Sequence, residues 1–231
     1  MTAPDETAAI AARYARRHAD ERYSPLQPDV WQLLQERQRA LLRGFKQHGL
    51  HDLAALKLTE VGCGSGGNLL ELLRLGFRPE NLQGIELLPE RHAQARHVLP
   101  AATTLWLGDA NLAPVAPASL DLVLQCTVFS SLLDDGFQQQ LADAMWRWLR
   151  PGGAVIWYDF TVNNPRNSDV RGVSLRRLRS LFPQARISHQ RVTLAPPLAR
   201  AVCRVHPALY GLFNLLSPLR THVLAWAQKP K

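Results

Sequence analysis

The fold of this chain is decided by one stretch, Thr59-Glu60-Val61-Gly62-Cys63-Gly64-Ser65-Gly66-Gly67-Asn68. It combines an acidic residue near the end of an apolar strand, a glycine-rich turn and the start of a helix. Glycines at such a turn let the backbone approach a ligand closely, because no side chain stands in the way. The helix behind it offers free N–H groups and the positive end of its dipole. The stretch therefore predicts a loop that binds a nucleotide cofactor.

Apolar runs and periodicity predict strands and helices in alternation around this loop. Strands are expected over residues 56–61, 82–87, 103–107, 120–125, 154–160, 185–194 and 222–228, and helices over 68–75, 89–98, 137–149 and 173–182. Such alternation implies right-handed crossovers and a doubly wound α/β sheet. Ligands of this fold class bind at the carboxyl ends of the central strands.

Two segments lie outside the alternation. Residues 1–50 carry predicted helices over 3–19 and 29–48, and we expect them to form a helical lid ahead of the domain at 51–231. A dense apolar insertion with arginines beside it occupies 198–220, before the last strand. Three interpretations of the insertion stay open: a lid over a substrate pocket, a dimer surface, or a basic amphipathic surface that docks on a membrane.

Composition indicates an ordinary globular protein, with 46% hydrophobic and 20% charged residues in 231. No run approaches the ~18 apolar residues of a membrane span, and the N-terminus lacks the pattern of a secretory signal. The three cysteines are widely spaced, which favours reduced thiols and a cytoplasmic location.

The formal net charge is +8, and from residue 172 to the end there are ten Lys or Arg and no Asp or Glu. A basic surface favours acidic partners such as nucleic acid, anionic lipid or a phosphorylated substrate. Charge alone does not choose among them, and a solvated basic face remains the simplest interpretation.

The glycine pattern fits two kinds of cofactor. Residues 62, 64 and 67 match the dinucleotide pattern G-x-G-x-x-G, whereas 62, 64 and 66 match the G-x-G-x-G of S-adenosylmethionine enzymes. Glu86, at the end of the second strand, can accept both ribose hydroxyls in either case. Glu60 separates the two, because its carboxylate would repel a pyrophosphate but attract the ammonium and sulfonium of S-adenosylmethionine.

Three further motifs follow in order: Gly108-Asp109-Ala110 after the third strand, Asp121 in the fourth, and Leu149-Arg150-Pro151-Gly152-Gly153 before the fifth. On these residues, over about 56–160, the chain resembles the class I S-adenosylmethionine-dependent methyltransferases of type 11. The resemblance implies a Rossmann-like seven-stranded sheet whose last strand, 222–228, is antiparallel. It also implies S-adenosylmethionine as cofactor and S-adenosylhomocysteine as product.

The resemblance implies that the cofactor is held by Glu60, Gly62, Gly64, Glu86, Asp109 and Ala110, and the predicted site includes their neighbours Cys63, Gly66, Asn68, Leu87 and Gly108. Gln125, at the end of the fourth strand, is expected to face the methionine end. From the N-terminal lid, Arg22 can reach the methionine carboxylate and Tyr23 can pack its ring near the sulfonium.

A second resemblance is narrower. Segments at 23–24, 128–131, 158–160, 163–167 and 194–198 resemble bacterial methyltransferases found among polysaccharide and glycolipid biosynthesis enzymes. This implies O-methylation of a sugar hydroxyl, on a small-molecule or glycan acceptor that can be acidic or lipid-linked, with peripheral contact at the inner membrane face as an option. The predicted acceptor-binding residues are Phe129, Tyr158, Asn163, Asn164 and Arg166.

Methyl transfer is an in-line displacement in which the protein mainly aligns the reactants and excludes water. An unactivated hydroxyl benefits from a general base. Asp159, at the end of the fifth strand, is the first candidate, with a loop-capping role as its alternative, and His18 and His189 follow. A metal-assisted variant could use Asp159 with Asn163 or Asn164, but no full ligand set is visible, so no metal is predicted.

Rival functions are an NAD-dependent oxidoreductase, a methyltransferase acting on another natural product or on nucleic acid, and a binding module that has lost activity. The chain lacks a Tyr-x-x-x-Lys constellation, and no Asn-Pro-Pro-Tyr-type motif follows the fourth strand. Both features favour the small-molecule methyltransferase, as a monomer or a homodimer.

Overall fold

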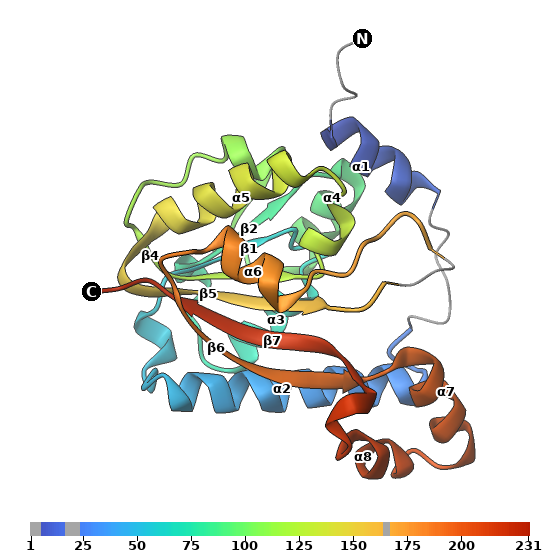
Figure 1. Cartoon of the computed structure of the whole chain (residues 1–231). Coiled ribbons are helices and arrows are strands. Elements are labelled where there is room, and N and C mark those ends of the chain that lie inside the picture. Colours follow the sequence, from blue (N-terminus) through green and yellow to red (C-terminus); the bar gives the residue numbers. More distant parts are fainter. Residues whose placement is uncertain (1–5, 17–23, 164–166) are drawn as a thin grey trace.

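A seven-stranded sheet in the order β3-β2-β1-β4-β5-β7-β6 forms the centre of the molecule (Figure 1). The computed structural model describes residues 6–16, 24–163 and 167–231. The strands are β1 (Leu58–Val61), β2 (Leu82–Glu86), β3 (Thr104–Leu107), β4 (Leu120–Cys126), β5 (Leu149–Phe160), β6 (Arg186–Leu194) and β7 (Arg220–Gln228). β7 runs antiparallel to both β5 and β6, whereas the other pairs are parallel. The predicted Rossmann-like topology is confirmed.

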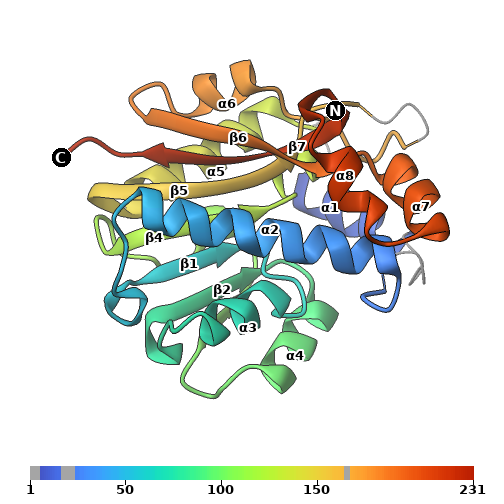
Figure 2. The ribbon, with the colours of Figure 1, turned by 90° about the horizontal axis from the view of Figure 1, so that it is seen from below.

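Helices cover both faces of the sheet (Figures 1 and 2). They are α1 (Glu6–Ala15), α2 (Pro28–Gln47), α3 (Gly67–Arg74), α4 (Pro89–Val98), α5 (Asp135–Trp148), α6 (Leu175–Leu181), α7 (Pro196–Val205) and α8 (Leu209–Asn214). Buried side chains of α1, α5 and α6 share one apolar cluster, and those of α2, α3 and α4 share the other. The central strands are therefore buried on both sides, which explains their nearly continuous apolar runs.

Capping residues set where two helices begin. Asp134 accepts a hydrogen bond from the Phe137 amide at 2.6 Å, so α5 starts at Asp135, two residues before the predicted position. Ser174 accepts from the Arg177 amide in the same way ahead of α6. A short side-chain oxygen at these positions satisfies an amide that the helix itself leaves free.

The two N-terminal helices occupy different places. α2 lies along one face of the sheet, where Ala40, Leu41 and Phe45 are buried in its core. α1 lies toward the carboxyl ends of the parallel strands, with Ile10 in the opposite core (Figure 1). α2 is thus a structural layer of the fold. The prediction that residues 1–50 form a lid now concerns α1 and the residues next to it.

The insertion at 198–220 forms α7, α8 and a 3-10 turn at Ser217–Leu219 around a small cluster of its own. Glu36 of α2 joins it to the rest of the molecule, accepting from the Tyr210 hydroxyl at 2.6 Å and the Thr193 amide at 2.9 Å. Several apolar side chains on its outside remain exposed: Val205, Leu212, Leu215 and Leu216. Among the described residues, no helix has the length and apolar content of a membrane span.

α2 and β7 approach closely at Gly44. A Cβ atom there would lie 2.5 Å from Nε1 of the buried Trp226. We expect Gly44→Ala to lower the free energy of unfolding by about 1–3 kcal/mol, because the indole must shift in a packed core. Gly211→Ala, in α8, is the matched control, because its Cβ would have no neighbour within 4 Å. Urea unfolding measures both, and equal stability of the two variants would contradict this packing.

Candidate functional site

The glycine loop joins β1 to α3 with three residues in the left-handed region. Gly62, Gly64 and Gly66 have φ values of 65°, 57° and 87°. Space is also restricted, because a Cβ on Gly62 would lie 2.6 Å from Val128 Cγ2, and one on Gly66 would lie 2.9 Å from Leu99 Cδ1. Glycine is therefore required by backbone conformation at all three positions, and by packing as well at Gly62 and Gly66.

Glu60 lies fully buried beside this loop. Its Oε1 accepts from Asn68 Nδ2 at 2.5 Å, and Arg37 of α2 donates to Asn68 Oδ1 at 2.6 Å. Its Oε2 is buried without a partner among the described residues. Burial raises the pKa of Glu60 to about 8, against the opposing effects of the Asn68 hydrogen bond and the Arg37 charge. The carboxyl thus has room for one more donor, preferably a cationic one.

Glu86 is fixed across from the glycine loop at the end of β2. Its Oε2 accepts from the Gly64 amide at 2.7 Å, and its Oε1 accepts from the Leu88 amide at 2.9 Å. Each carboxylate oxygen can accept more than one hydrogen bond. Glu86 can therefore hold the loop in place and still accept from a ligand hydroxyl.

The segment after β3 carries the third acidic residue. Asp109 Oδ1 accepts from the Asn111 amide at 2.9 Å and from Asn111 Nδ2 at 3.1 Å, which caps the turn at Ala110–Leu112. Gly108, with φ 143°, turns the chain into this position. Asn111 Oδ1 is buried without a partner among the described residues. The sequence analysis did not predict Asn111, because the Gly108-Asp109-Ala110 motif ends one residue before it.

Gln125 and Asp159 hold the turn that follows β4. Gln125 Oε1 accepts from the Val128 amide at 3.0 Å. The Asp159 oxygens accept from the amides of Ser130 at 3.1 Å and Phe160 at 3.0 Å. Both side chains are fully buried. Burial raises the pKa of Asp159 to about 7, and the hydrogen bonds from Ser130 and Phe160 oppose that rise. This geometry favours the loop-capping alternative for Asp159 and leaves the catalytic role as a prediction.

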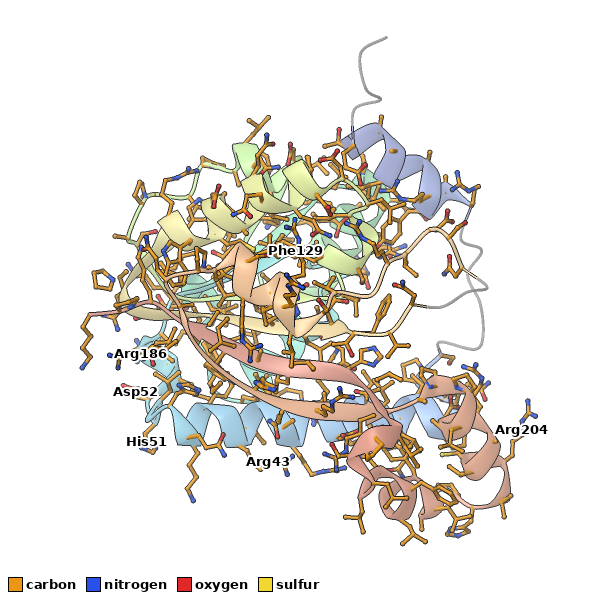
Figure 3. All side chains as sticks on the ribbon, in the orientation of Figure 1. Arg43, His51, Asp52, Phe129, Arg186 and Arg204 are labelled. Carbon is orange, nitrogen blue, oxygen red and sulfur yellow. The ribbon has the colours of Figure 1, made fainter. Side chains whose placement is uncertain are left out.

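The described acceptor-site candidates have partners within the protein. Phe129 is fully buried, 4.5 Å from the Trp157 ring, and Figure 3 shows it between α5 and the sheet. The Tyr158 hydroxyl shares a 2.8 Å hydrogen bond with Thr193, and Asn163 Oδ1 accepts from the Gly172 amide at 2.8 Å. The structure does not bring these three together. Four other predicted residues lie outside the described residues: Arg22, Tyr23, Asn164 and Arg166, as does the candidate base His18.

A cavity beside Glu60 contains residues that the sequence analysis missed. Arg37, Glu71 and Cys126 line it together with Asn68 and Tyr158. The Arg37 guanidinium lies 5.5 Å from the centre of the Tyr158 ring and 3.6 Å from Glu71. Arg37 precedes the glycine loop by more than twenty residues in the chain, and only the packing of α2 on the sheet brings it there.

α1 is attached to the carboxyl end of the sheet by polar contacts. Arg13 donates to the Ser131 carbonyl at 3.0 Å and pairs with Glu6 at 2.7 Å, and Glu6 accepts from the Leu133 amide at 2.9 Å. The Arg91 guanidinium lies 4.6 Å from the centre of the Tyr14 ring. α1 therefore connects the turn after β4 to the start of α4, on either side of the glycine loop. Among the described residues, no group of three or more His, Cys, Asp or Glu is placed to bind a metal.

Residues 59–157 match the family model described as "Methyltransferase domain". No curated protein matches the chain. Among solved structures, a 1,6-didemethyltoxoflavin-N1-methyltransferase of Burkholderia thailandensis is 17% identical with a TM-score of 0.67, covering 100% of this chain and 92% of that one. Phosphoethanolamine N-methyltransferase 1 of Haemonchus contortus is 12% identical with a TM-score of 0.66, covering 100% and 50%. A SAM-dependent methyltransferase of Archaeoglobus fulgidus is 13% identical with a TM-score of 0.59, covering 84% and 96%.

The structural neighbours confirm the fold, and the family match covers the strands that carry the glycine loop and the acids after it. Together with the site geometry, they define the class: a methyltransferase of Rossmann-like fold. Residues 59–157 are a methyltransferase domain, and these matches support S-adenosylmethionine as its methyl donor and S-adenosylhomocysteine as its product.

Because the pKa of Glu60 is raised in the folded protein, the free energy of unfolding should depend on pH. Between the ordinary value of 4.5 and about 8, the unfolded chain loses this proton and the folded chain keeps it. Stability from this group is therefore fully present below pH 4.5 and falls as the pH rises. We expect the difference in unfolding free energy between the wild type and Glu60→Gln to change by up to about 1.4 kcal/mol per pH unit in this window. Denaturant unfolding from pH 5 to 8 measures it, and a pH-independent difference would contradict a neutral Glu60.

Proposed function

We propose that Glu60 and the loop at 62–66 hold the methionine part of S-adenosylmethionine, and that Glu86, Asp109 and Ala110 hold its nucleoside. The supporting observation is Glu60 Oε2, a buried acceptor without a partner among the described residues. Leaving such an atom unpaired is unfavourable, and an ammonium group would supply the missing donor. The remaining residues of the proposed cofactor site are Cys63, Asn68, Leu87, Gly108 and Gln125.

Two additions to the site come from the structure. Arg37 lies beside Glu60 and Asn68, where its charge suits the methionine carboxylate, for which the sequence predicts Arg22. The buried Asn111 Oδ1, next to Asp109, has no partner among the described residues, and an adenine amino group would find an acceptor there. Arg22 and Tyr23 remain predictions, because they lie outside the described residues.

We propose that the acceptor is a small molecule or a glycan and that its methylated atom is a sugar hydroxyl, as in bacterial polysaccharide or glycolipid biosynthesis. The support is the sequence resemblance around residues 128–131, which follow β4, 158–160, which end β5, and 163–167, which come after β5. A nitrogen acceptor is the main rival, because two of the structural neighbours are named as N-methyltransferases.

Asp159 is the proposed general base for such a hydroxyl. The bound cofactor supplies a methyl group on a sulfonium, and the protein has to align the acceptor and exclude water. A pKa of about 7 suits a base that works near neutral pH. Reaching the acceptor would require the Ser130 amide to release Asp159, because that carboxyl is fully buried.

The cofactor site is tested by titration with S-adenosylhomocysteine. We expect Glu86→Ala and Asp109→Ala each to weaken binding by about 10- to 100-fold, because each removes charge-assisted hydrogen bonds. Glu80→Ala is the matched control, because Glu80 is exposed and precedes the opposite end of β2. Isothermal titration calorimetry measures the affinities. Equal affinities in all three variants, or binding of NADH in place of S-adenosylhomocysteine, would contradict the proposed site.

The role of Asp159 is tested by Asp159→Asn with a range of nucleotide-linked and lipid-linked sugars as acceptors. A general base contributes about 10²- to 10⁴-fold, so we expect kcat to fall by at least 100-fold with cofactor affinity unchanged. The wild-type rate should rise with pH through about 7 as the carboxyl loses its proton. Unchanged turnover with a lower melting temperature would show that Asp159 only holds the turn after β4.

A further inference from the structure

Residues of α2, β6 and the end of the insertion line a polar groove. β6 is at the opposite edge of the sheet from β3, with α2 and α8 beside it (Figure 2). Four arginines line it: Arg39 and Arg43 of α2, Arg191 of β6 and Arg220 at the start of β7. The other lining residues are Glu36, Gln190, Val192, Asn214 and Leu215. β6 is the edge strand, four positions from β1 in the sheet order, so this groove is separate from the glycine loop.

The positive charge of the groove has no carboxylate partner within the described part of the chain. Over the described residues, none of these four guanidinium groups forms an ion pair with a carboxylate. The one acid in the lining, Glu36, is buried, and both its oxygens accept from Tyr210 and Thr193. Arg39 and Arg43 lie one helical turn apart, where like charges repel. A ligand that brings negative charge would relieve this repulsion.

One of the guanidinium groups is held in a fixed orientation. Arg220 donates from Nε to the Asn214 carbonyl at 2.7 Å and from Nη1 to the Arg191 carbonyl at 2.9 Å. A second donor, Nη2, also points to the Asn214 carbonyl. A guanidinium has five N–H groups, so Arg220 keeps donors for a ligand while its position is fixed. Fixed, planar donors are well suited to the oxygens of a phosphate.

The groove borders an apolar surface. Leu215 lines the groove and is 73% exposed, and Leu212 and Leu216 beside it are 60% and 56% exposed. These three leucines belong to α8 and the two residues that follow it. A ligand bound through its phosphate at the arginines would therefore have an apolar surface directly beside it.

We propose that this groove binds the phosphate or diphosphate group of an amphiphilic molecule, whose apolar part lies along Leu212, Leu215 and Leu216. The arginines supply charge and hydrogen-bond donors, and the leucines lose contact with water. The same chemistry is offered by a lipid phosphate in a bilayer and, without the apolar part, by a free phosphate. The proposal is independent of the methylated atom and of the proposed cofactor residues.

The phosphate site is tested by calorimetric titration of the full chain with inorganic pyrophosphate. We expect the Arg39→Gln/Arg43→Gln double variant to bind at least tenfold more weakly than the wild type. The control is Arg186→Gln/Arg204→Gln, which removes the same charge at two exposed arginines outside the groove, labelled with Arg43 in Figure 3. Equal weakening in both double variants would show a general effect of net charge and overturn the site. Unchanged S-adenosylhomocysteine binding confirms that the variants are folded.

Vesicle flotation separates the two sources of phosphate. We expect binding to vesicles of phosphatidylcholine with phosphatidic acid, but not to phosphatidylcholine alone. This binding should be lost in Arg39→Gln/Arg43→Gln and in Leu215→Ser/Leu216→Ser, whereas the leucine variant keeps pyrophosphate affinity. Pyrophosphate binding without vesicle binding would overturn the apolar half of the proposal and leave a site for free phosphates. Binding of neither probe would overturn the proposal.

Discussion

The site depends on a buried carboxyl group at the end of a central strand. Glu60 is held by Asn68 of α3, and Asn68 is held in turn by Arg37 of α2. This one chain of hydrogen bonds connects β1 and α3, which are neighbours in the sequence, to α2, whose Arg37 lies 31 residues before Asn68. A buried acid with an unpaired oxygen is unfavourable in the free protein, and it persists only where the surrounding structure fixes it. The position of α2 on the sheet is therefore part of the site as well as of the core.

Features defined by residues close together in the sequence could be predicted, whereas those that depend on tertiary packing could not. The glycine loop and Glu86 were predictable, because a strand, a turn and a helix in direct succession define them locally. The central strands were predictable because their apolar runs reflect burial on both faces. Arg37 was not predictable, because nothing in α2 indicates which of its arginines faces the sheet until the helix is packed.

The residues predicted to contact the acceptor illustrate a different problem: their place at a strand end did not reveal their structural role. Asp159 is predicted as a base because it lies at the end of β5, where ligands of this fold bind, and Phe129 is predicted to contact the acceptor from the sequence resemblance. The structure shows that these positions also have to close the turns after the strands: the Asp159 oxygens accept backbone amides, and Phe129 packs against Trp157. A buried polar group at a strand end satisfies the backbone first. Position along the chain therefore does not separate a residue that builds the edge from one that faces the ligand.

Charge is distributed unevenly over the fold. The acids Glu60, Glu86 and Asp109 lie at or just after the ends of β1, β2 and β3, whereas the four groove arginines lie on α2, β6 and β7, around the opposite edge of the sheet. A cofactor that carries a sulfonium and an ammonium is attracted to the first region, and phosphate groups are repelled from it. Phosphates are attracted to the second region, so the two ligand classes are kept apart by electrostatics as well as by shape. The +8 net charge of the chain is thus better understood as a local property of its C-terminal half than as a general affinity for polyanions.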